Sequence, residues 1–420
     1  MLFVGFVHYF VCVIMVVITI YMVRQYSFTV NRLFGRQRHP YIDIETADWP
    51  KVSILVAAHN EEAVIEHSLN ALLNVVYPKD KLQIIIANDR STDATKEILD
   101  EFTERYPERF LAFHRTEGKP GKAAALKDAT EYATGEILII FDADYIPGRG
   151  LIKQLTTAFF DPEIGLVMGR VVPYNTDYNL LTRLIDLERS AGYQVGQQAR
   201  MNMQMVPQYG GTVGGVRKSM LESIGGWRDD VLAEDTDLTY RALLKGWKTA
   251  YHNHSECYEE APQTWPARIK QIMRWGKGHN QVMFEQCGKV IMSGEVSLAQ
   301  WLDGLLLLAV YILSPIVMIG WFLLVVVFYK LGLHPLHEFW PMLSLIIYGA
   351  SGNFVAYFEI AAAVYLDGGR KRILLLPLNF MNFIVSLVAI SRTTFNQLIG
   401  DRFRSGGLKW DKTPRFRRRN

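Results

Sequence analysis

The clearest chemical signal in this sequence is a pair of aspartates at the end of an apolar segment. Asp142 and Asp144 follow 137-ILIIF-141, and one alanine separates them. Two carboxylates at a strand end can share a hard divalent cation that keeps its other positions for phosphate oxygens. Because such a cation stabilises a diphosphate leaving group, we expect Mg²⁺ or Mn²⁺ at this pair.

A basic, glycine-rich segment lies upstream of the aspartates. The stretch 118-GKPGKAAALKDA-129 offers flexible backbone and the lysines Lys119 and Lys122 ahead of a predicted helix. The spacing differs from the G-x4-G-K-[ST] of a P-loop. We therefore expect contact with a diphosphate, but through an element of another type.

A second acidic cluster precedes a helical pattern in 231-VLAEDTDLTYRALLKG-246. Acidic residues suit the N-terminus of a helix because of its dipole, which accounts for one of Glu234, Asp235 and Asp237. Three acids exceed what a helix start requires. A carboxylate can act as the base that activates an acceptor hydroxyl in glycosyl or acyl transfer, so this cluster contains the candidate base.

Short apolar segments that end in polar clusters must position these residues. Four such segments are 51-KVSILVAA-58, 82-LQIIIAND-89, 110-FLAFHR-115 and 135-GEILIIFDAD-144, and helical patterns run up to Leu73 and over 94–105. Buried strands that alternate with helices form a parallel sheet, and ligands bind beyond the carboxyl ends of its strands. Turn chemistry explains any single polar cluster. Its repetition at successive strand ends predicts an α/β ligand-binding domain.

The composition predicts a soluble domain joined to a few membrane helices. Half of the 420 residues are hydrophobic, too many for an ordinary soluble enzyme and too few for a pure membrane bundle. A net charge of only +3 gives no reason to expect a nucleic-acid partner. Cys12, Cys257 and Cys287 are too scattered for a disulfide framework or a zinc site, which fits a reducing compartment.

The N-terminal apolar segment reads as an uncleaved membrane anchor. Leu2 to Val23 is nearly all apolar, and arginines follow at positions 24, 32, 36 and 38. About 20 apolar residues span a bilayer, and positive charge marks the cytoplasmic side. A signal peptide would carry its charge before the apolar segment. We therefore expect the N-terminus outside the cell and the chain from residue 24 onward in the cytoplasm.

Three further apolar runs occupy about 301–328, 341–366 and 373–399. If all four runs cross the membrane, the basic tail 415-RFRRRN-420 lies outside, against the positive-inside tendency. We therefore expect one run not to cross. The run 373–399 is the best candidate, since it contains Pro377, Asn379, Asn382, Arg392 and Asn396.

The ordered motifs resemble those of the processive family-2 glycosyltransferases, which include cellulose, chitin, hyaluronan and poly-N-acetylglucosamine synthases. The matching segments are 58-AHNE-61, Asp89 in 88-NDRSTD-93, 119-KPGKAAAL-126, 142-DAD-144, 210-GGTVGG-215, 234-ED-235 and 271-QIMRW-275. Each motif alone is modest, whereas the ordered set is specific. The resemblance covers roughly residues 50–290 and implies a GT-A-type α/β domain with a mostly parallel sheet.

The resemblance also implies a role for each matching residue. The residues that it implies contact the sugar donor are His59, Asn60, Glu61, Asp89, Lys122, Asp142, Gln271 and Arg274. Asp142 and Asp144 would hold the metal, and Asp235 would be the base with Glu234 beside it. Trp275 and the loop residues Gly211, Thr212 and Gly214 would face the acceptor. Ala233 stands where the family usually has Thr, which puts the role of that hydroxyl in doubt.

The tail segment 409-KWDKTPR-415 resembles a gating motif that closes over the donor in related synthases. Its residues would be Trp410, Thr413 and Arg415, and a basic tail without this role is the alternative. The expected divisions are an anchor (1–24), a cytoplasmic catalytic domain (48–262), interface helices (263–298), membrane helices (299–400) and the tail (401–420).

The leading hypothesis is a multi-pass plasma-membrane enzyme that polymerises a β-linked polysaccharide from a UDP-sugar and translocates the growing chain. N-acetylglucosamine and glucose are the favoured sugars. One alternative is a non-processive enzyme that glycosylates a membrane lipid. Another is a nucleotide-sensing transporter or receptor, which few membrane helices make less attractive. A small membrane subunit or a homo-oligomer would help to complete a channel.

Overall fold

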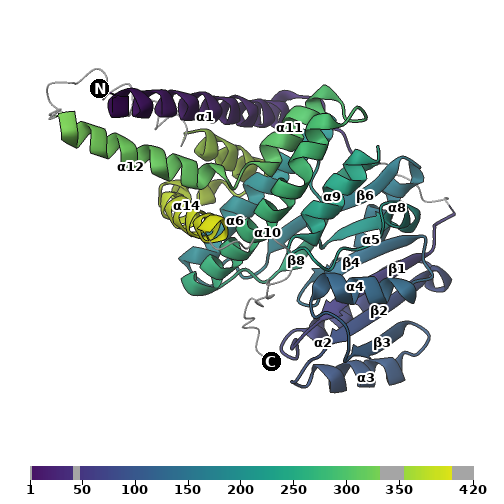
Figure 1. Ribbon diagram of the computed structural model, residues 1–420. Coiled ribbons are helices and arrows are strands. Elements are labelled where there is room, and N and C mark those ends of the chain that lie inside the picture. The colour runs from purple at the N-terminus through teal and green to yellow at the C-terminus, as the bar shows by residue number, and fades with distance from the viewer. Residues whose placement is uncertain (1, 41–47, 332–353, 400–420) are drawn as a thin grey trace.

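The computed structural model describes residues 2–40, 48–331 and 354–399. The expected gating residues Trp410, Thr413 and Arg415, the basic tail and the first half of the 341–366 run lie outside the described residues. Within them, one sheet of eight strands has the order β3-β2-β1-β4-β7-β6-β8-β5. The sheet and its covering helices form one part of the molecule, and α1, α12 and α14 gather on the other (Figure 1).

The four apolar segments form four parallel strands, as predicted. The strands are β1 Val52–Ala58, β2 Leu82–Asp89, β3 Phe110–Arg115 and β4 Ile137–Asp142, joined by α2 Ile65–Leu73, the short helix η1 Lys79–Lys81, α3 Thr95–Arg105 and α4 Lys122–Glu131. Ala58 pairs with Asn88, and Ala57 pairs with Asp142. Because neighbouring strands end at the same level, the polar residues that follow them emerge together at one edge.

The second half of the domain extends this sheet. Its elements are β5 Ile146–Pro147, α5 Leu151–Thr157, η2 Ala158–Phe160, β6 Ile164–Pro173, α6 Leu180–Ser190, the π-helix η3 Ala191–Gln197, α7 Gln198–Asn202, β7 Gly214–Arg217, α8 Lys218–Ser223, α9 Glu234–Leu244 and β8 Lys248–Glu259. Strand β7 runs antiparallel to β4 and β6, whereas β6 and β8 are parallel. The predicted α/β class with a mostly parallel sheet is confirmed.

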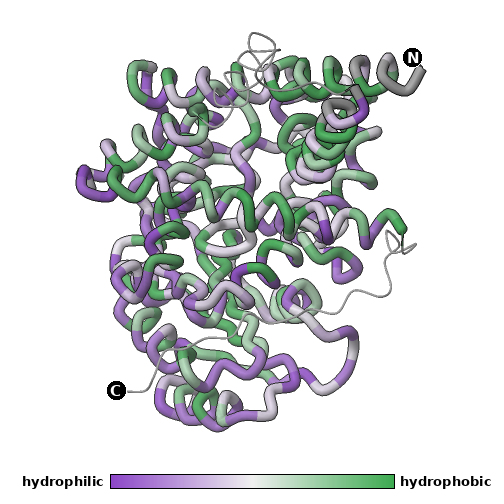
Figure 2. Tube along the Cα trace, turned by 90° about the vertical axis from the view of Figure 1, so that its left-hand side faces the viewer, coloured by the Kyte–Doolittle hydropathy of each residue, from purple (hydrophilic) through white to green (hydrophobic). Residues whose placement is uncertain are grey.

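Long helices make up the rest of the described chain. They are α1 Leu2–Phe34, α10 Trp265–Met292, α11 Leu298–Leu308, α12 Leu313–Leu331, an apolar helix Phe354–Leu366, η4 Arg370–Leu375 and α14 Leu376–Ile399. Gly5–Phe34 and Arg370–Ile399 are long and apolar enough to cross a membrane, and α11 with the start of α12 would make a third span if the bent pair counts as one. The helices at the top of Figure 2, α1 among them, are largely hydrophobic.

That the 373–399 run lies in the membrane interface or re-enters stays a prediction, and a bend occurs in another run. Residues 370–399 form a long apolar helix, whereas the 301–328 run turns by 62° between α11 and α12. Two of the asparagines that suggested otherwise, Asn379 and Asn382, are buried inside the protein. The bend precedes Pro315, which cannot donate the helical hydrogen bond to the carbonyl of residue 311 and crowds that carbonyl.

The loop after the helix Phe354–Leu366 is attached to the catalytic domain. Asp367 accepts hydrogen bonds from Arg170 on β6 at 2.8 Å, from Ser190 on α6 at 2.7 Å and from Gln194 of the π-helix at 2.7 Å. This cationic loop therefore lies on the same side of any membrane as the sheet.

Candidate active site

A cavity of about 1040 Å³ opens at the carboxyl ends of β1, β2 and β4 and extends to α10 and the α11–α12 bend. Most of the predicted site residues line it: His59, Glu61, Asp89, Lys122, Asp142, Asp144, Thr212, Glu234, Asp235, Gln271, Arg274 and Trp275. The structure thus brings together residues that lie more than 200 positions apart in the sequence.

Among the predicted residues that the structure describes, three do not line the cavity. Asn60 lies beside it with a φ of 53°, and its side chain accepts a hydrogen bond from the Thr92 backbone at 2.7 Å. Gly211 packs behind the acids, and a Cβ on it would stand 3.2 Å from the Asp235 Cβ. Gly214 begins β7 and is buried in the sheet. A role for these residues in binding stays a prediction.

Asp89 anchors the glycine-rich segment at the strand-end part of the cavity. Its Oδ1 accepts a hydrogen bond from Arg115 Nη1 at 2.6 Å, and its Oδ2 accepts one from the Gly121 backbone at 2.6 Å. His59 Nδ1 donates to the Asp89 carbonyl at 2.6 Å. These bonds bind the ends of β1 and β2 to the segment that introduces Lys122, so this edge of the cavity is preorganised.

Lys122 lies between the first acidic pair and the second. Its Nζ is 2.6 Å from Asp142 Oδ1 and 3.6 Å from Glu234 Oε1, and it donates to the Gly211 carbonyl at 2.8 Å. Burial lowers the pKa of Lys122, but the Asp142 and Glu234 carboxylates outweigh it, so the net shift is upward. The lysine is therefore a permanent positive charge in the cavity.

The Asp142–Asp144 pair fits a divalent cation that shares its coordination with a substrate. In the described part of the chain, no group of three or more His, Cys, Asp or Glu side chains could hold a metal by itself. Both aspartates line the cavity, and Asp142 already holds the positive Lys122 amine. Two carboxylates that need phosphate and water as further ligands suit Mg²⁺ or Mn²⁺.

The acids at the start of α9 divide into two kinds. Asp235 lines the cavity, and burial followed by repulsion from Glu234 raises its pKa to about 7. Asp237 is fully buried and makes an ion pair with Arg241 at 2.6 Å and another with Arg228 at 3.2 Å. Asp235 therefore has the location and the pKa of a general base, whereas the buried ion pairs of Asp237 give it a structural role.

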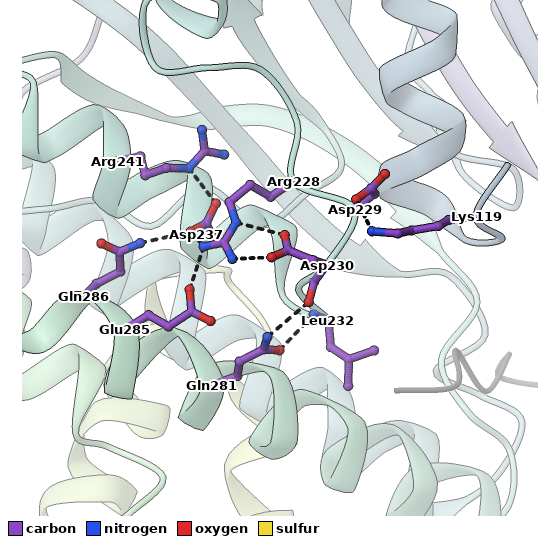
Figure 3. A network of polar contacts seen from close by, with 10 residues as sticks. All are labelled: Lys119, Arg228, Asp229, Asp230, Leu232, Asp237, Arg241, Gln281, Glu285 and Gln286. Atoms are coloured by element: carbon purple, nitrogen blue, oxygen red, sulfur yellow. Dashed lines mark hydrogen bonds and ion pairs between the residues drawn. The ribbon is translucent and has the colours of Figure 1, made fainter. Parts of the chain in front are cut away.

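Arg228 joins the wall of the cavity to α10, as Figure 3 shows. Its guanidinium reaches Asp230 at 2.6 Å, Asp237 at 3.2 Å and Glu285 at 2.6 Å. Gln281, also on α10, donates to the Asp230 carbonyl at 3.1 Å. The segment 229–236, which contains both candidate catalytic acids, is thereby fixed to the helix that supplies Gln271, Arg274 and Trp275.

The far end of the cavity contains an aromatic and charged cluster around Trp275. The guanidinium carbons of Arg189 and Arg268 lie 5.1 and 5.4 Å from the centre of its ring. Arg268 pairs with Glu188 at 2.5 Å and donates to Gln271 at 2.8 Å. Two arginine guanidinium groups therefore make cation–π contacts with the Trp275 ring, and each contact contributes about 0.5–2 kcal/mol.

The sequence reasoning missed several residues that line this end. They are Glu188, Arg189, Tyr193, Gln197, Arg200, Glu259, His279 and Tyr311. They come from α6, the π-helix, α7, β8, α10 and the α11–α12 bend, and no local motif joins them. π-helical turns are rare and frequently occur at functional sites, but the segment 191–197 carries no sequence pattern that we recognised. Pro315 was the available signal for the bend.

This sheet with acids at its strand ends defines a GT-A-like fold, and comparison with solved structures supports that class. "Mannosyltransferase PcManGT from Pyrobaculum calidifontis in complex with GDP-Man and Mn2+" superposes with a TM-score of 0.62. The match covers 86% of this chain and 97% of that chain at 22% identity. At this identity, the similarity shows the fold alone.

The family model described as "Glycosyltransferase like family 2" matches residues 50–278, and the chain belongs to this family of glycosyltransferases. The probable glycosyltransferase YdaM of Bacillus subtilis (strain 168) is 36% identical over 56% of this chain. A beta-monoglucosyldiacylglycerol synthase of Nostoc sp. is 30% identical over 67% of it, and glucomannan 4-beta-mannosyltransferase 7 of Arabidopsis thaliana is 28% identical over 66%. The chain spans 57%, 60% and 50% of these relatives' own lengths.

Proposed function

We propose that this protein transfers a hexose from a nucleoside diphosphate sugar to the headgroup of a membrane lipid. The observation that carries this proposal is the continuity of the cavity. It begins at the strand-end acids and ends at Trp275, His279 and Tyr311, next to the apolar helix α12. A polar donor and an amphiphilic acceptor can therefore meet at Asp235.

The donor occupies the strand-end part of the cavity in this proposal. His59, Asn60, Glu61 and Asp89 surround the nucleoside, and Lys122, Gln271 and Arg274 contact the diphosphate. Arg274 lines the cavity, and its Nε is buried without a hydrogen-bond partner in the described part of the chain. Arginine binds phosphate oxygens through several parallel N–H donors, so a diphosphate would satisfy this group. We expect UDP as the nucleotide.

Asp142 and Asp144 would hold Mg²⁺ or Mn²⁺. When bound, this cation would stabilise negative charge on the departing diphosphate. Lys122, which Asp142 and Glu234 keep protonated, supplies further positive charge on that side. Chelation is therefore expected to abolish transfer.

Asp235 acts as the base for the transfer itself. Its carboxylate takes the proton from an acceptor hydroxyl while that oxygen attacks the anomeric carbon of the sugar. The bond from this carbon to the diphosphate oxygen breaks on the opposite face, and the nucleoside diphosphate leaves with the electron pair. A single displacement of this kind inverts the anomeric configuration and requires no protein nucleophile.

The proposed acceptor is a lipid, whereas the sequence alone favoured a growing polysaccharide. Two observations support a lipid: the cavity ends at Tyr311, two residues before the apolar helix α12, and one relative is named a beta-monoglucosyldiacylglycerol synthase. For the same reason, glucose becomes the favoured sugar over N-acetylglucosamine. A second candidate, processive synthesis of a β-linked polysaccharide, is supported by the QIMRW motif and by the glucomannan-forming relative.

We also propose that the protein is a multi-pass membrane protein with its catalytic domain in the cytoplasm, alone or with a small membrane subunit or a second copy. Because Asp367 ties the 367–372 loop to β6 and α6, this loop should share the compartment of the catalytic domain. A Lys371→Cys variant in a background without the native cysteines tests the orientation. Labelling by an impermeant maleimide in intact cells would contradict it.

A product analysis tests the proposed function. Purified full-length protein in lipid nanodiscs, with and without diacylglycerol, is incubated with Mg²⁺ or Mn²⁺ and labelled UDP-glucose, UDP-N-acetylglucosamine or GDP-mannose. We expect label in the organic extract only when diacylglycerol is present, and none with Asp235→Asn. A water-soluble product of many sugars would overturn the lipid proposal in favour of the polymer. Free sugar alone from every donor would overturn both.

A further inference from the structure

The bend between α11 and α12 places a tyrosine in the cavity. Tyr311 lies in the four residues between Leu308 and Leu313 and is one of the cavity-lining residues. The next helix, α12, presents large apolar side chains at its surface, including Trp321, Phe322 and Val325. Tyr311 is therefore located where the polar cavity meets the apolar helices.

Contacts with α10 fix the ring of Tyr311. It packs edge-to-face on His279, with the ring centres 4.9 Å apart. A Cβ on Gly276 would stand 3.7 Å from Tyr311 Cδ1, so the ring lies against the helix next to Trp275. Such ring pairs contribute about 0.5–1.5 kcal/mol beyond burial, which keeps the side chain in one place.

His279 supports this arrangement as a neutral group. Its Nε2 donates to the Leu307 carbonyl near the end of α11 at 2.9 Å. Burial lowers the pKa of His279 to about 4. The imidazole therefore stays uncharged at neutral pH and joins α10 to the bend without attracting anions.

The polar end of Tyr311 is available to a ligand. Its hydroxyl makes no hydrogen bond with another residue in the described part of the chain, whereas the buried Tyr145 and Tyr240 donate to Glu259 and to the Gly304 carbonyl. Tyr311 also lies within the electrostatic reach of Glu188, Arg268 and Asp235. A phenol with a fixed ring and an unused hydroxyl near the base can orient an alcohol.

We propose that Tyr311 is an acceptor-binding residue that holds the hydroxyl-bearing headgroup of a glycerolipid while the acyl chains stay along the apolar surface of α12. This inference rests on the proposed function and adds the position at which the lipid is recognised. The headgroup of such a lipid is small and carries a hydroxyl, which the Tyr311 phenol can orient beside the Trp275 indole and the neutral His279 imidazole. The charged groups nearby, Glu188, Arg189 and Arg268, face Tyr311 from α6 and α10.

Kinetics with two acceptors test this assignment. The variants are Tyr311→Phe, which keeps the ring, and Tyr311→Ala, and the control is Tyr329→Phe on the exposed part of α12. The acceptors are a long-chain diacylglycerol in nanodiscs and a short-chain diacylglycerol in detergent. The loss of one hydrogen bond costs about 0.5–1.5 kcal/mol, so Tyr311→Phe should raise the acceptor KM about 2- to 12-fold for both lipids. The donor KM and the acceptor-independent release of UDP should stay within about twofold.

The outcomes separate this inference from the function on which it rests. If the wild-type protein forms no glycolipid, the proposed function fails and the assignment of Tyr311 to a lipid headgroup falls with it. If it forms glycolipid and the acceptor KM of Tyr311→Phe and Tyr311→Ala equals that of the control, Tyr311 does not bind the acceptor. An effect on the long-chain lipid alone would also overturn the proposal, because Tyr311 would then contact the acyl chains and not the headgroup.

Discussion

The two ends of the cavity are built in different ways. At the donor end, neighbouring strands deliver His59, Asp89 and Asp142 to one edge, and hydrogen bonds within the protein already hold Asp89. At the proposed acceptor end, separate helices converge on Trp275, and the Tyr311 hydroxyl makes no hydrogen bond with another described residue. The proposed donor end therefore follows from the fold, whereas the proposed acceptor end depends on how the apolar helices pack on it.

The largest effect is expected at Asp235, where the two ends meet. Asp235→Asn removes the base but keeps the size of the side chain, so transfer should fall by about 10²- to 10⁴-fold. Binding of UDP-sugar, measured by calorimetry, should change little. If donor affinity collapses while turnover at saturation survives, Asp235 belongs to the donor end and Glu234 becomes the candidate base.

Asp237 should behave in the opposite way, although it lies only two residues further along α9. Asp237→Asn leaves Arg228 and Arg241 without their shared buried anion, and breaking a buried ion pair costs about 3–5 kcal/mol of stability. Thermal unfolding should show a clear loss, with activity per folded molecule largely kept. The control is Asp229→Asn, because its partner Lys119 is exposed to solvent and such a surface pair is worth about 0–1 kcal/mol. Equal stability of both variants would contradict the structural role assigned to Asp237.

Arg274 tests whether α10 serves the donor as well as the acceptor. Hydrogen bonds to charged groups contribute about 1.5–3 kcal/mol, so Arg274→Ala should raise the donor KM about 10- to 100-fold. Lys270→Ala, an exposed cation on the same helix, should have little effect. An unchanged donor KM in Arg274→Ala would restrict α10 to the acceptor end.

The smallest effect is a pH dependence set by Asp235. Its pKa is raised to about 7, and a base works in its deprotonated form, so kcat/KM should fall as the pH drops below about 7, approaching tenfold per unit. Because the pKa of Asp235 rises from 3.8 to about 7 on folding, the folded state binds this proton more tightly than the unfolded state. The protonated carboxyl therefore adds to the free energy of unfolding at low pH, and this contribution declines as the pH rises from 3.8 through about 7. A kcat/KM that is flat down to pH 5 would contradict this assignment.

The sequence predicted the donor end because its signals are local. Apolar strands that end in 59-HNEE-62, 88-NDRSTD-93 and 142-DAD-144 lie next to each other in a parallel sheet, so their order along the chain fixes their meeting point. The start of α9 at Glu234 also followed from its helical pattern. The site roles themselves remain predictions.

The acceptor end could not be predicted because it arises from long-range packing. Arg189, Glu259 and Tyr311 belong to three elements whose approach depends on the docking of α10 and α14, which no local periodicity encodes. The partners of the polar residues on α14 were unpredictable for the same reason. Asn382 donates to Glu188 at 2.9 Å, so it faces the protein.

A structure of the full-length protein in a nanodisc, with UDP, Mn²⁺ and diacylglycerol, tests most directly the claim that one cavity joins donor and lipid. The account predicts density for the diphosphate beside Lys122 and Arg274. It also predicts that the glycerol hydroxyl lies within hydrogen-bonding distance of Asp235 and Tyr311, with the acyl chains leaving along α12. Lipid density confined to the outer surface of the helices, with an acceptor-free cavity around Trp275, would contradict it.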